Sequence, residues 1–387
     1  MRKPAGIESL YIDFDCFFAS VEKQLDPSLQ GRPVGVIPLE SEHTSMIARC
    51  YTAKAAGVQR GTSVREAREL CPDIELRGAR HDVYVRIHHR ILEEIDRHVP
   101  VVKVWSVDEM ECRLDRREQA RATDLAEDIR RGLKQAVGPW ITPSIGLAPN
   151  QFLAKVAAEM NKPNGLTVLH PDNLPGSLKQ LSLRDLPGVA KGVEARLHRS
   201  GVYDVIDLWN LAPKHARAIW GSVEGERFWA QLHGYDVEKP RTERGMYGHG
   251  RVLASGWQTP EKAYECARLL LIKAARRMRR EGYRASTLSL SLGSRRQGRA
   301  WSGQTSFFPT RDDRIFLKAL ARLPEQSVAV LGSSAKIPKV SVMLSNIEPF
   351  GEHTDDLFKA RDTATRRKDG EALIDLIDQM NIQHKSA

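Results

Sequence analysis

The chain has 387 residues, 41% of them hydrophobic, and a formal net charge of +10. This length is enough for two to four domains, each with its own core. No stretch reaches the roughly 18 apolar residues of a membrane-spanning helix, and Met1 to Leu10 lacks the apolar core of a signal peptide. The five cysteines are scattered without a Cys-x-x-Cys pair, which argues against a zinc site and a disulfide framework. We expect a monomeric protein that stays in the cytosol.

The first half of the chain alternates short apolar strands with amphipathic helices. Strands are predicted at 10–12, 34–37, 100–107 and 140–146, and helices at 17–25, 46–56, 83–98, 124–137 and 150–160. Gly57 is expected to end the second helix, and Asp82 to cap the third. The alternation up to about Leu169 indicates one α/β or α+β domain that carries an insertion at 15–77.

The second half begins with short helices and turns at 171–234. After a polar linker, Thr259 and Pro260 mark the start of a long helix that Gly282 ends. Alternating apolar residues at 288–292 and 340–344 then predict strands. These elements indicate a separate, small α+β domain.

Positive charge is concentrated in that second domain. Residues 245–350 carry 18 Lys and Arg against 7 Asp and Glu, which accounts for the whole net charge of the chain. Such a basic block is typical of a protein with a polyanionic partner. A solvated basic face would give the same count, so the charge alone leaves both interpretations open.

Acidic residues stand at the ends of two predicted strands. Asp13 and Asp15 follow the first strand, and Asp108 and Glu109 follow the strand at 100–107. Carboxylates at the ends of adjacent strands can converge on one point, and Mg²⁺ prefers such oxygen ligands. Two ions about 3.5–4 Å apart can activate a 3′-hydroxyl and stabilise a leaving pyrophosphate. Strand-end acids are often ordinary turn residues, however, so their spacing alone does not decide the question.

Three segments resemble, in order, the motifs of Y-family DNA polymerases. They are Tyr11 to Glu22 (YIDFDCFFASVE), Ser106 to Glu109 (SVDE), and Asn150 to Gly165, which ends in Lys-Pro-Asn-Gly. The resemblance covers roughly residues 10–350. It implies an α+β multidomain fold, the right-hand polymerase architecture with a separate α+β little finger. The implied domains are a palm (1–14 and 78–169), fingers (15–77), a helix-hairpin-helix-like thumb (170–234), a linker (235–244), a little finger (245–350) and a tail (351–387).

The resemblance also implies an activity, a cofactor and site residues. The chain would be a template-directed, low-fidelity, lesion-bypassing DNA polymerase that uses two Mg²⁺ ions, primer–template DNA and deoxynucleoside triphosphates. Asp13, Asp108 and Glu109 would hold the metals together with the Phe14 carbonyl. Phe18 would be the steric gate against a ribose 2′-hydroxyl, with Phe17 under the sugar; without the motif, both would be taken for core residues. The residues expected to face the triphosphate are Tyr51, Lys54 and Lys162.

Further residues are expected to contact DNA or a partner protein. Gly188 lies in Pro187-Gly-Val-Ala190, where a hairpin would bind DNA phosphate through backbone N–H groups. The basic helix offers Arg276, Arg277, Arg279 and Arg280. In the tail, the pair Leu357 and Phe358 resembles a degenerate peptide for docking on the sliding clamp, although the pair could equally pack back on the protein.

The sequence departs from the family pattern at several positions. Many polymerase IV-like relatives have Arg where this chain has Lys54, and Lys lacks the bidentate fork of Arg. The residues around that position look more like the UmuC-type branch. Met110 to Arg113 replaces the usual Ala-Tyr-Leu-Asp, and Ala190 replaces a hairpin Gly. Two other functions stay open: a catalytically inactive adaptor of a mutagenesis complex, and a basic DNA-binding protein without chemistry.

Overall fold

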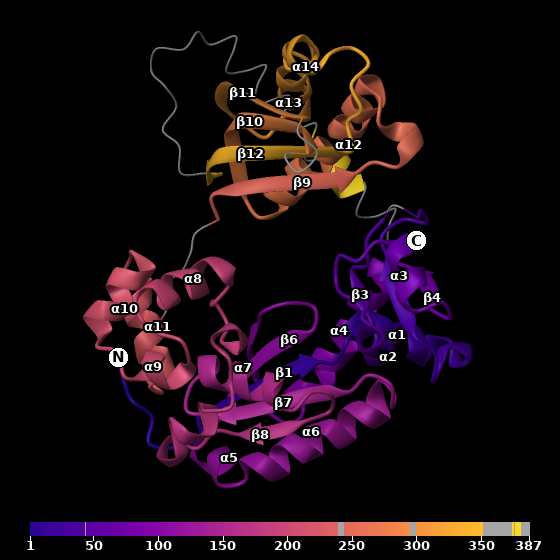
Figure 1. The fold of residues 1–387 in the computed structure, drawn as a ribbon. Coiled ribbons are helices and arrows are strands. Elements are labelled where there is room, and N and C mark those ends of the chain that lie inside the picture. Colours follow the sequence, from indigo (N-terminus) through magenta and orange to yellow (C-terminus); the bar gives the residue numbers. More distant parts are fainter. Residues whose placement is uncertain (43, 239–243, 295–298, 351–373, 375, 381–387) are drawn as a thin grey trace. The chain divides into compact units, whose positions relative to one another are not determined.

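The computed structural model describes residues 1–42, 44–238, 244–294, 299–350, 374 and 376–380. The chain divides into two compact units, Met1–Pro240 and Arg241–Ala387 (Figure 1). Among the described residues, no helix has the length and apolar character needed to cross a membrane.

The described part of unit 1 is built on a five-stranded sheet with the strand order β5-β6-β1-β7-β8. Its strands are β1 (Ser9–Phe14), β5 (Val101–Val104), β6 (Glu109–Arg113), β7 (Pro143–Ala148) and β8 (Leu166–Val168). The central strand β1 is buried along its whole length and pairs antiparallel with β6 and β7. Burial on both faces explains why this strand reads as a nearly continuous apolar run.

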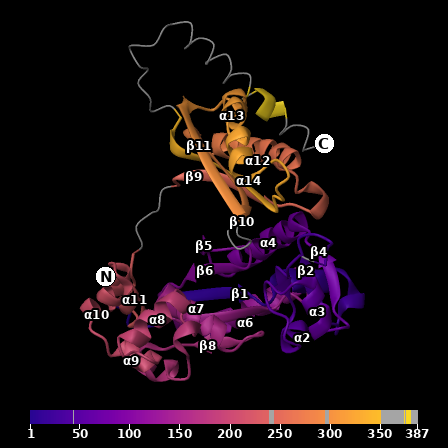
Figure 2. The same ribbon diagram turned by 45° about the horizontal axis from the view of Figure 1, so that its top comes forward.

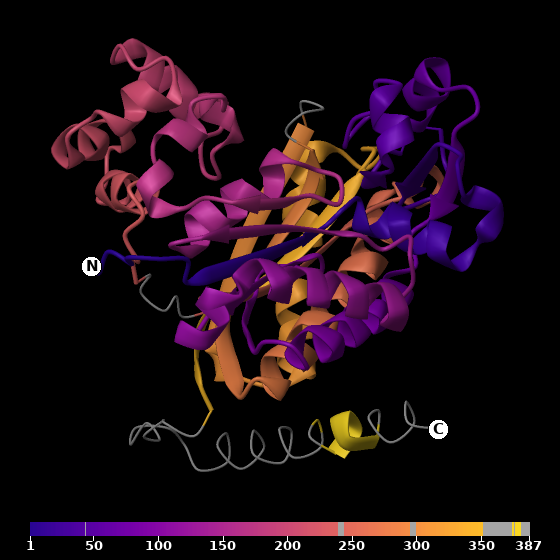
Figure 3. The same ribbon diagram turned by 90° about the horizontal axis from the view of Figure 1, so that it is seen from below.

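Helices cover both faces of this sheet. They are α4 (His81–Asp96), α5 (Arg116–Ala120), α6 (Ala122–Ala136) and α7 (Gln151–Met160). Successive side chains of a strand point to opposite faces. Leu10, Ile12 and Phe14 join the core formed with α4 and α6, and α6 faces the viewer in Figure 3. Tyr11 belongs to the core formed with α7. Asp13 is two residues after Tyr11, so its side chain lies on the same face of the sheet, the one that α7 covers.

The segment between β1 and α4 forms a small subdomain. Its elements are α1 (Phe17–Leu25), η1 (Pro27–Leu29), β2 (Val34–Ile37), β3 (Ala48–Arg49), α2 (Tyr51–Ala55), α3 (Val64–Leu70) and β4 (Glu75–Gly78). Among the described residues, its strands form a sheet with the order β3-β2-β4. The predicted insertion therefore has a sheet of its own.

The predicted helix at 46–56 is wrong in its first half. Residues Ala48 and Arg49 pair with β2, and the Cys50 N–H donates to the Val34 carbonyl at 2.9 Å. The helix begins at Tyr51, and Gly57 follows its end with a φ of +94°, as expected for a left-handed cap. Met46 is fully buried, and pairing with β2 satisfies the backbone around it, so tertiary contacts override the helical pattern.

Other predicted boundaries also shift. Helix α4 begins at His81 with Arg80 in the cap position, so Asp82 lies inside the first turn and is not the cap. The strand predicted at 140–146 runs from Pro143 to Ala148. Helix α5 was not predicted, although Asp115 and Glu118 form a capping box at its start.

The rest of unit 1 consists of short helices. They are η2 (Pro171–Asn173), η3 (Gly176–Leu178), η4 (Leu183–Asp185), α8 (Lys191–Arg199), α9 (Val205–Trp209), α10 (Pro213–Trp220) and α11 (Glu224–Leu232). Apolar residues of these helices share a core with α7. The Asn150 side chain links the two parts, because its amide donates to the Gln231 and Tyr235 carbonyls while its oxygen caps α7.

The described part of unit 2 is a four-stranded sheet with the order β11-β10-β12-β9. Its elements are β9 (Met246–Val252), η5 (Ser255–Trp257), α12 (Pro260–Arg280), β10 (Tyr283–Ser294), β11 (Arg299–Thr310), α13 (Asp313–Leu320), α14 (Pro324–Leu331) and β12 (Lys339–Pro349). The helices α12, α13 and α14 lie along one face of the sheet (Figure 2). The predicted alternation is confirmed, since Leu288 pairs with Leu344 and Leu290 with Val342, all four buried against the helices.

Candidate active site

The site is centred on two acids that the sheet brings together. The antiparallel register of β1 and β6 places Asp13 directly opposite Glu109. A third acid, Glu159 of α7, joins them, and among the described residues the carboxylate oxygens of all three lie within 4.8 Å of one another. Sequence reasoning missed Glu159, although it lies inside the third motif. Clustered carboxylate oxygens of this kind suit a hard divalent cation such as Mg²⁺.

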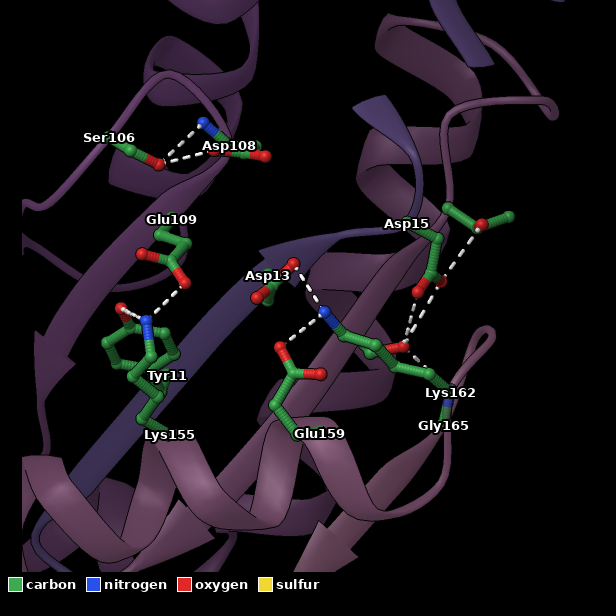
Figure 4. A network of polar contacts seen from close by, with 12 residues as sticks. Tyr11, Asp13, Asp15, Ser106, Asp108, Glu109, Lys155, Glu159, Lys162 and Gly165 are labelled. Atoms are coloured by element: carbon green, nitrogen blue, oxygen red, sulfur yellow. Dashed lines mark hydrogen bonds and ion pairs between the residues drawn. The ribbon is translucent and has the colours of Figure 1, made fainter. Parts of the chain in front are cut away.

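Asp108 lies beside this cluster but points elsewhere. Its carboxylate accepts a hydrogen bond from the Ser106 hydroxyl, and Figure 4 shows it turned toward Ser106. Its carbonyl accepts a hydrogen bond of 2.9 Å from the Phe14 N–H. The structure therefore brings Asp13 and Glu109 together. Asp108, the residue before Glu109, stays on the loop, and its carboxylate points away from the cluster.

Two lysines neutralise the cluster. The Lys162 ammonium lies 2.7 Å from Asp13 Oδ1 and 2.7 Å from Glu159 Oε1. The Lys155 ammonium pairs with Glu109 and lies 3.4 Å from the Tyr11 hydroxyl. Figure 4 shows both ammonium groups directed into the acid cluster. Each of the two opposed strand acids thus has a lysine partner.

Burial and the neighbouring lysines shift the pKa values of two acids of the cluster in opposite directions. Burial raises the pKa of Asp13, and the nearby Lys162 opposes this effect without cancelling it. Glu159 shares the same ammonium group. Burial acts to raise its pKa, but the attraction of Lys162 and Lys155, together with hydrogen bonds to Lys162 and Asp13, lowers the pKa. A buried carboxylate that is costly to ionise gains from an additional cation.

Asp15 has a different role from Asp13, although both belong to the same motif. It is buried, and it accepts hydrogen bonds from the Tyr51 hydroxyl at 3.0 Å, from Ser144 Oγ at 3.0 Å and from the Asn164 N–H at 2.7 Å. These donors come from α2, from β7 and from the Lys-Pro-Asn-Gly loop. Asp15 therefore ties the subdomain that carries Tyr51 to the central sheet.

The two motif phenylalanines occupy different environments. Phe17 is buried in the core, whereas Phe18 is half-buried and stacks on Tyr84 of α4, with ring centroids 4.2 Å apart. The Tyr84 hydroxyl donates to Glu22 at 2.7 Å, and Arg80 forms an ion pair with the same carboxylate. Sequence reasoning missed this support, although Glu22 closes the first motif.

The comparisons identify the family. Residues 12–159 match the model of the impB/mucB/samB family, and residues 245–357 match the model of its C-terminal domain. The chain is 34% identical to DNA polymerase IV of Moorella thermoacetica over 296 residues, which are 73% of this chain and 72% of that protein. It is 37% identical to DNA polymerase IV of Pseudomonas syringae pv. syringae over 232 residues, which are 59% of this chain and 64% of that protein.

The chain belongs to the Y family of DNA-directed DNA polymerases. Its fold agrees with solved structures of such enzymes. A Y-family DNA polymerase chimera aligns with a TM-score of 0.72 at 21% identity, covering 88% of this chain and 98% of that one. An insertion ternary complex of Dbh DNA polymerase aligns with a TM-score of 0.59, covering 89% and 99%. The predicted right-hand α+β architecture is confirmed.

Two further candidate residues of this Y-family polymerase, one predicted to bind the nucleotide and one to bind DNA, lie on exposed positions. Lys54 is exposed on α2, and its ammonium lies 5.6 Å from the centroid of the Tyr51 ring. Within the described ranges it forms no ion pair, which leaves its charge available to a ligand. Gly188 is exposed in the turn before α8, with a φ of +95° that favours glycine.

The four predicted arginines of α12 differ from one another. Arg276, Arg277 and Arg280 are exposed. The side chain of Arg279 is 2% exposed, lies against Asp313 and Asp378, and donates to the Arg311 carbonyl at 3.0 Å. Its guanidinium therefore holds α12 to α13 and to the segment around Asp378. The clamp candidates Leu357 and Phe358 lie outside the described residues.

Proposed function

We propose that this Y-family polymerase adds deoxynucleotides to a primer 3′ end by two-metal phosphoryl transfer, with low fidelity and with bypass of damaged template bases. Membership of the family supports the reaction class. The observation that carries the proposal is the register of β1 and β6, which sets Asp13 opposite Glu109 with Asp108 next in the chain. The Lys-Pro-Asn-Gly loop follows α7 at the same end of the sheet.

Asp13, Asp108 and Glu109, together with the Phe14 carbonyl, would hold two Mg²⁺ ions. Bound there, the ions would activate the primer hydroxyl and stabilise the leaving pyrophosphate. The chain supplies the geometry, since the strand register holds Asp13 and Glu109 together. The hydrogen bond from the Phe14 N–H to the Asp108 carbonyl keeps the second pair of acids beside the end of β1.

The incoming deoxynucleoside triphosphate would lie between α2 and the sheet. Lys54 and Lys162 supply positive charge for its phosphates, and the Tyr51 ring lies beside Lys54. Phe18, supported from behind by Tyr84, would fill the space that a ribose 2′-hydroxyl needs, and Phe17 would lie under the sugar. Discrimination against ribonucleotides then depends on a ring that cannot move away easily.

Primer–template DNA is the proposed macromolecular substrate. One solved neighbour is titled as a ternary complex of a polymerase, which supports this assignment. We propose a palm at 1–14 and 78–169, fingers at 15–77, a thumb at 170–234 and a little finger at 245–350. The thumb turn at Gly188 and the basic residues of unit 2 would bind phosphates, which supplies affinity without reading sequence.

The test is primer extension by the full chain with Mg²⁺, on undamaged templates and on templates with one abasic site. Asp108→Ala is expected to abolish incorporation while primer–template affinity, measured by fluorescence anisotropy, stays near the wild-type value. The reason is that the acids serve chemistry, whereas basic surface supplies most of the affinity.

Asp124→Ala is the matched control, because Asp124 is an exposed acid on α6, which packs on the other face of the sheet. This variant is expected to retain wild-type extension. Extension by Asp108→Ala would refute the two-metal assignment, and a wild type that binds DNA without extending it would favour the adaptor function.

A further inference from the structure

Lys155 reaches from α7 across the sheet to Glu109. Its ammonium group forms an ion pair with Glu109 Oε1 and also lies 3.4 Å from the Tyr11 hydroxyl. The ammonium group also lies over the Tyr11 ring, with Nζ 5.4 Å from the ring centroid. The Lys155 and Glu109 side chains are 25% and 21% exposed. The pair is therefore largely shielded from water.

Lys162 makes an equivalent contact with the opposite acid, but the two lysines are not interchangeable. Lys162 bridges Asp13 and Glu159, so it keeps a carboxylate partner when a ligand takes Asp13. Within the described residues, Lys155 forms its one ion pair with Glu109. When a ligand takes Glu109, Lys155 is left without that partner.

We infer that Lys155 is a positioning residue that competes with a divalent cation for Glu109 and so lowers the affinity of this acid for the metal. The inference rests on the proposed metal site. An ammonium group beside Glu109 repels a second cation at the same carboxylate and occupies one of its oxygens, so the ion pair weakens the binding of a metal ion there. A protein that must first leave a stable arrangement binds its ligand with reduced apparent affinity.

The competition has a consequence for the reaction. An enzyme whose acids are already paired holds divalent cations weakly until the nucleotide arrives, because the triphosphate brings its own oxygen ligands. Lys155 thereby favours binding of the metal together with the nucleotide. The Tyr11 hydroxyl supports this role, since it offers the ammonium group a second acceptor beside Glu109.

The test measures metal binding rather than activity. The full chain, without DNA or nucleotide, is titrated with Mn²⁺, and free Mn²⁺ is followed by electron paramagnetic resonance. Lys155→Met removes the charge and keeps the chain length of the side chain. It is expected to tighten Mn²⁺ binding by about threefold to tenfold, the range of a partly shielded ion pair. Lys155→Arg keeps a cation and is expected to bind Mn²⁺ like the wild type.

Two further variants complete the design. Tyr11→Phe keeps the ring and removes the second acceptor, so it is expected to tighten binding by less than Lys155→Met. Lys134→Met removes an exposed lysine of α6 and is expected to change nothing. Thermal unfolding of each variant checks that it folds. If Lys155→Met fails to fold, Tyr11→Phe still tests the inference.

The outcomes separate this inference from the proposed function. If Glu109→Gln abolishes Mn²⁺ binding and Lys155→Met leaves the affinity unchanged or weaker, the metal site stands and the role of Lys155 is refuted. If Glu109→Gln binds Mn²⁺ as the wild type does, the metal site itself is refuted, and the inference fails with it.

Discussion

Asp13 and Asp15 are the same residue type two positions apart, yet their partners give them different tasks. Asp15 accepts hydrogen bonds from four different residues, including Thr142 at 3.2 Å. Asp13 lies in an acid cluster where burial raises its pKa. Asp13 is the acid that we propose as a metal ligand, whereas Asp15 holds two parts of unit 1 together.

A residue-scale prediction concerns Phe18. Phe18→Ala is expected to lower the selectivity for deoxyribonucleotides over ribonucleotides by about 10- to 200-fold, the range in which a pocket discriminates by shape. The measurement is the ratio of kcat/KM for the two nucleotides in single-nucleotide incorporation. Tyr84→Phe is the matched control, because it keeps the stacked ring and removes only the hydroxyl. Unchanged selectivity in Phe18→Ala would show that another group excludes the 2′-hydroxyl.

The helix α12 illustrates how one element serves both fold and surface. Its apolar residues Ala267, Leu271 and Met278 pack on the sheet of unit 2. Arg279 is next to Met278 and lies on the buried side, where Asp313 and Asp378 neutralise it. Arg276, Arg277 and Arg280 remain on the exposed side of the same helix. One arginine of the helix, Arg279, therefore stabilises the fold, and the other three lie on the surface.

An element-scale prediction follows from this separation. Replacing Arg276, Arg277 and Arg280 together by Gln is expected to flatten the salt dependence of DNA binding, by about one unit of slope for each DNA phosphate that the variant no longer neutralises. Fluorescence anisotropy at several salt concentrations measures the slope.

The fourth arginine provides the contrast. Arg279→Gln is expected to leave the slope unchanged and to lower the free energy of unfolding by about 3 kcal/mol, because it leaves the largely shielded Asp313 without its arginine partner. An unchanged slope in the triple variant would mean that α12 does not contact DNA. A flattened slope in Arg279→Gln would contradict its structural role.

On the scale of the whole molecule, the acids of the candidate active site and the excess of basic residues lie in different parts of the chain. Unit 1 contains the acids and the proposed gate residue Phe18, whereas residues 245–350 carry the net positive charge of the protein. Under the proposed function, we expect that DNA affinity and metal-dependent chemistry can be altered independently. The segment 351–387 follows these basic residues in the sequence and contains the candidate clamp peptide.

The whole-molecule prediction concerns this candidate peptide. A docking peptide tethers the enzyme to the clamp, which raises its effective concentration at the primer without new DNA contacts. The double variant Leu357→Ala/Phe358→Ala is expected to lose clamp stimulation of primer extension and to keep the basal rate. The measurement is product length with and without the sliding clamp of the host. Equal stimulation of the variant and the wild type would exclude this segment as the docking site.

The sequence by itself determined the family, the order of the motifs and most strands and helices. Local patterns carry this information, since apolar residues repeat with the period of a helix or a strand, and Gly57, Thr259 and Gly282 mark ends. Asp13 and Glu109 could be named in advance because each lies in a recognisable motif. The strand predicted at 100–107 is shorter than expected, and Glu109 begins the next strand, β6, so the antiparallel pairing of β1 and β6 sets the two acids opposite each other.

Tertiary structure alone decided which groups meet. Lys155 and Glu109 are 46 residues apart, so no local pattern links them. Glu159 joins Asp13 because α7 crosses the face of the sheet to which Asp13 points, and Arg279 turns inward because α13 presents a carboxylate there. Pairing with β2 likewise turned residues 48–49 from helix to strand. Contacts between distant segments depend on packing and burial, and these arise only when the whole chain is folded.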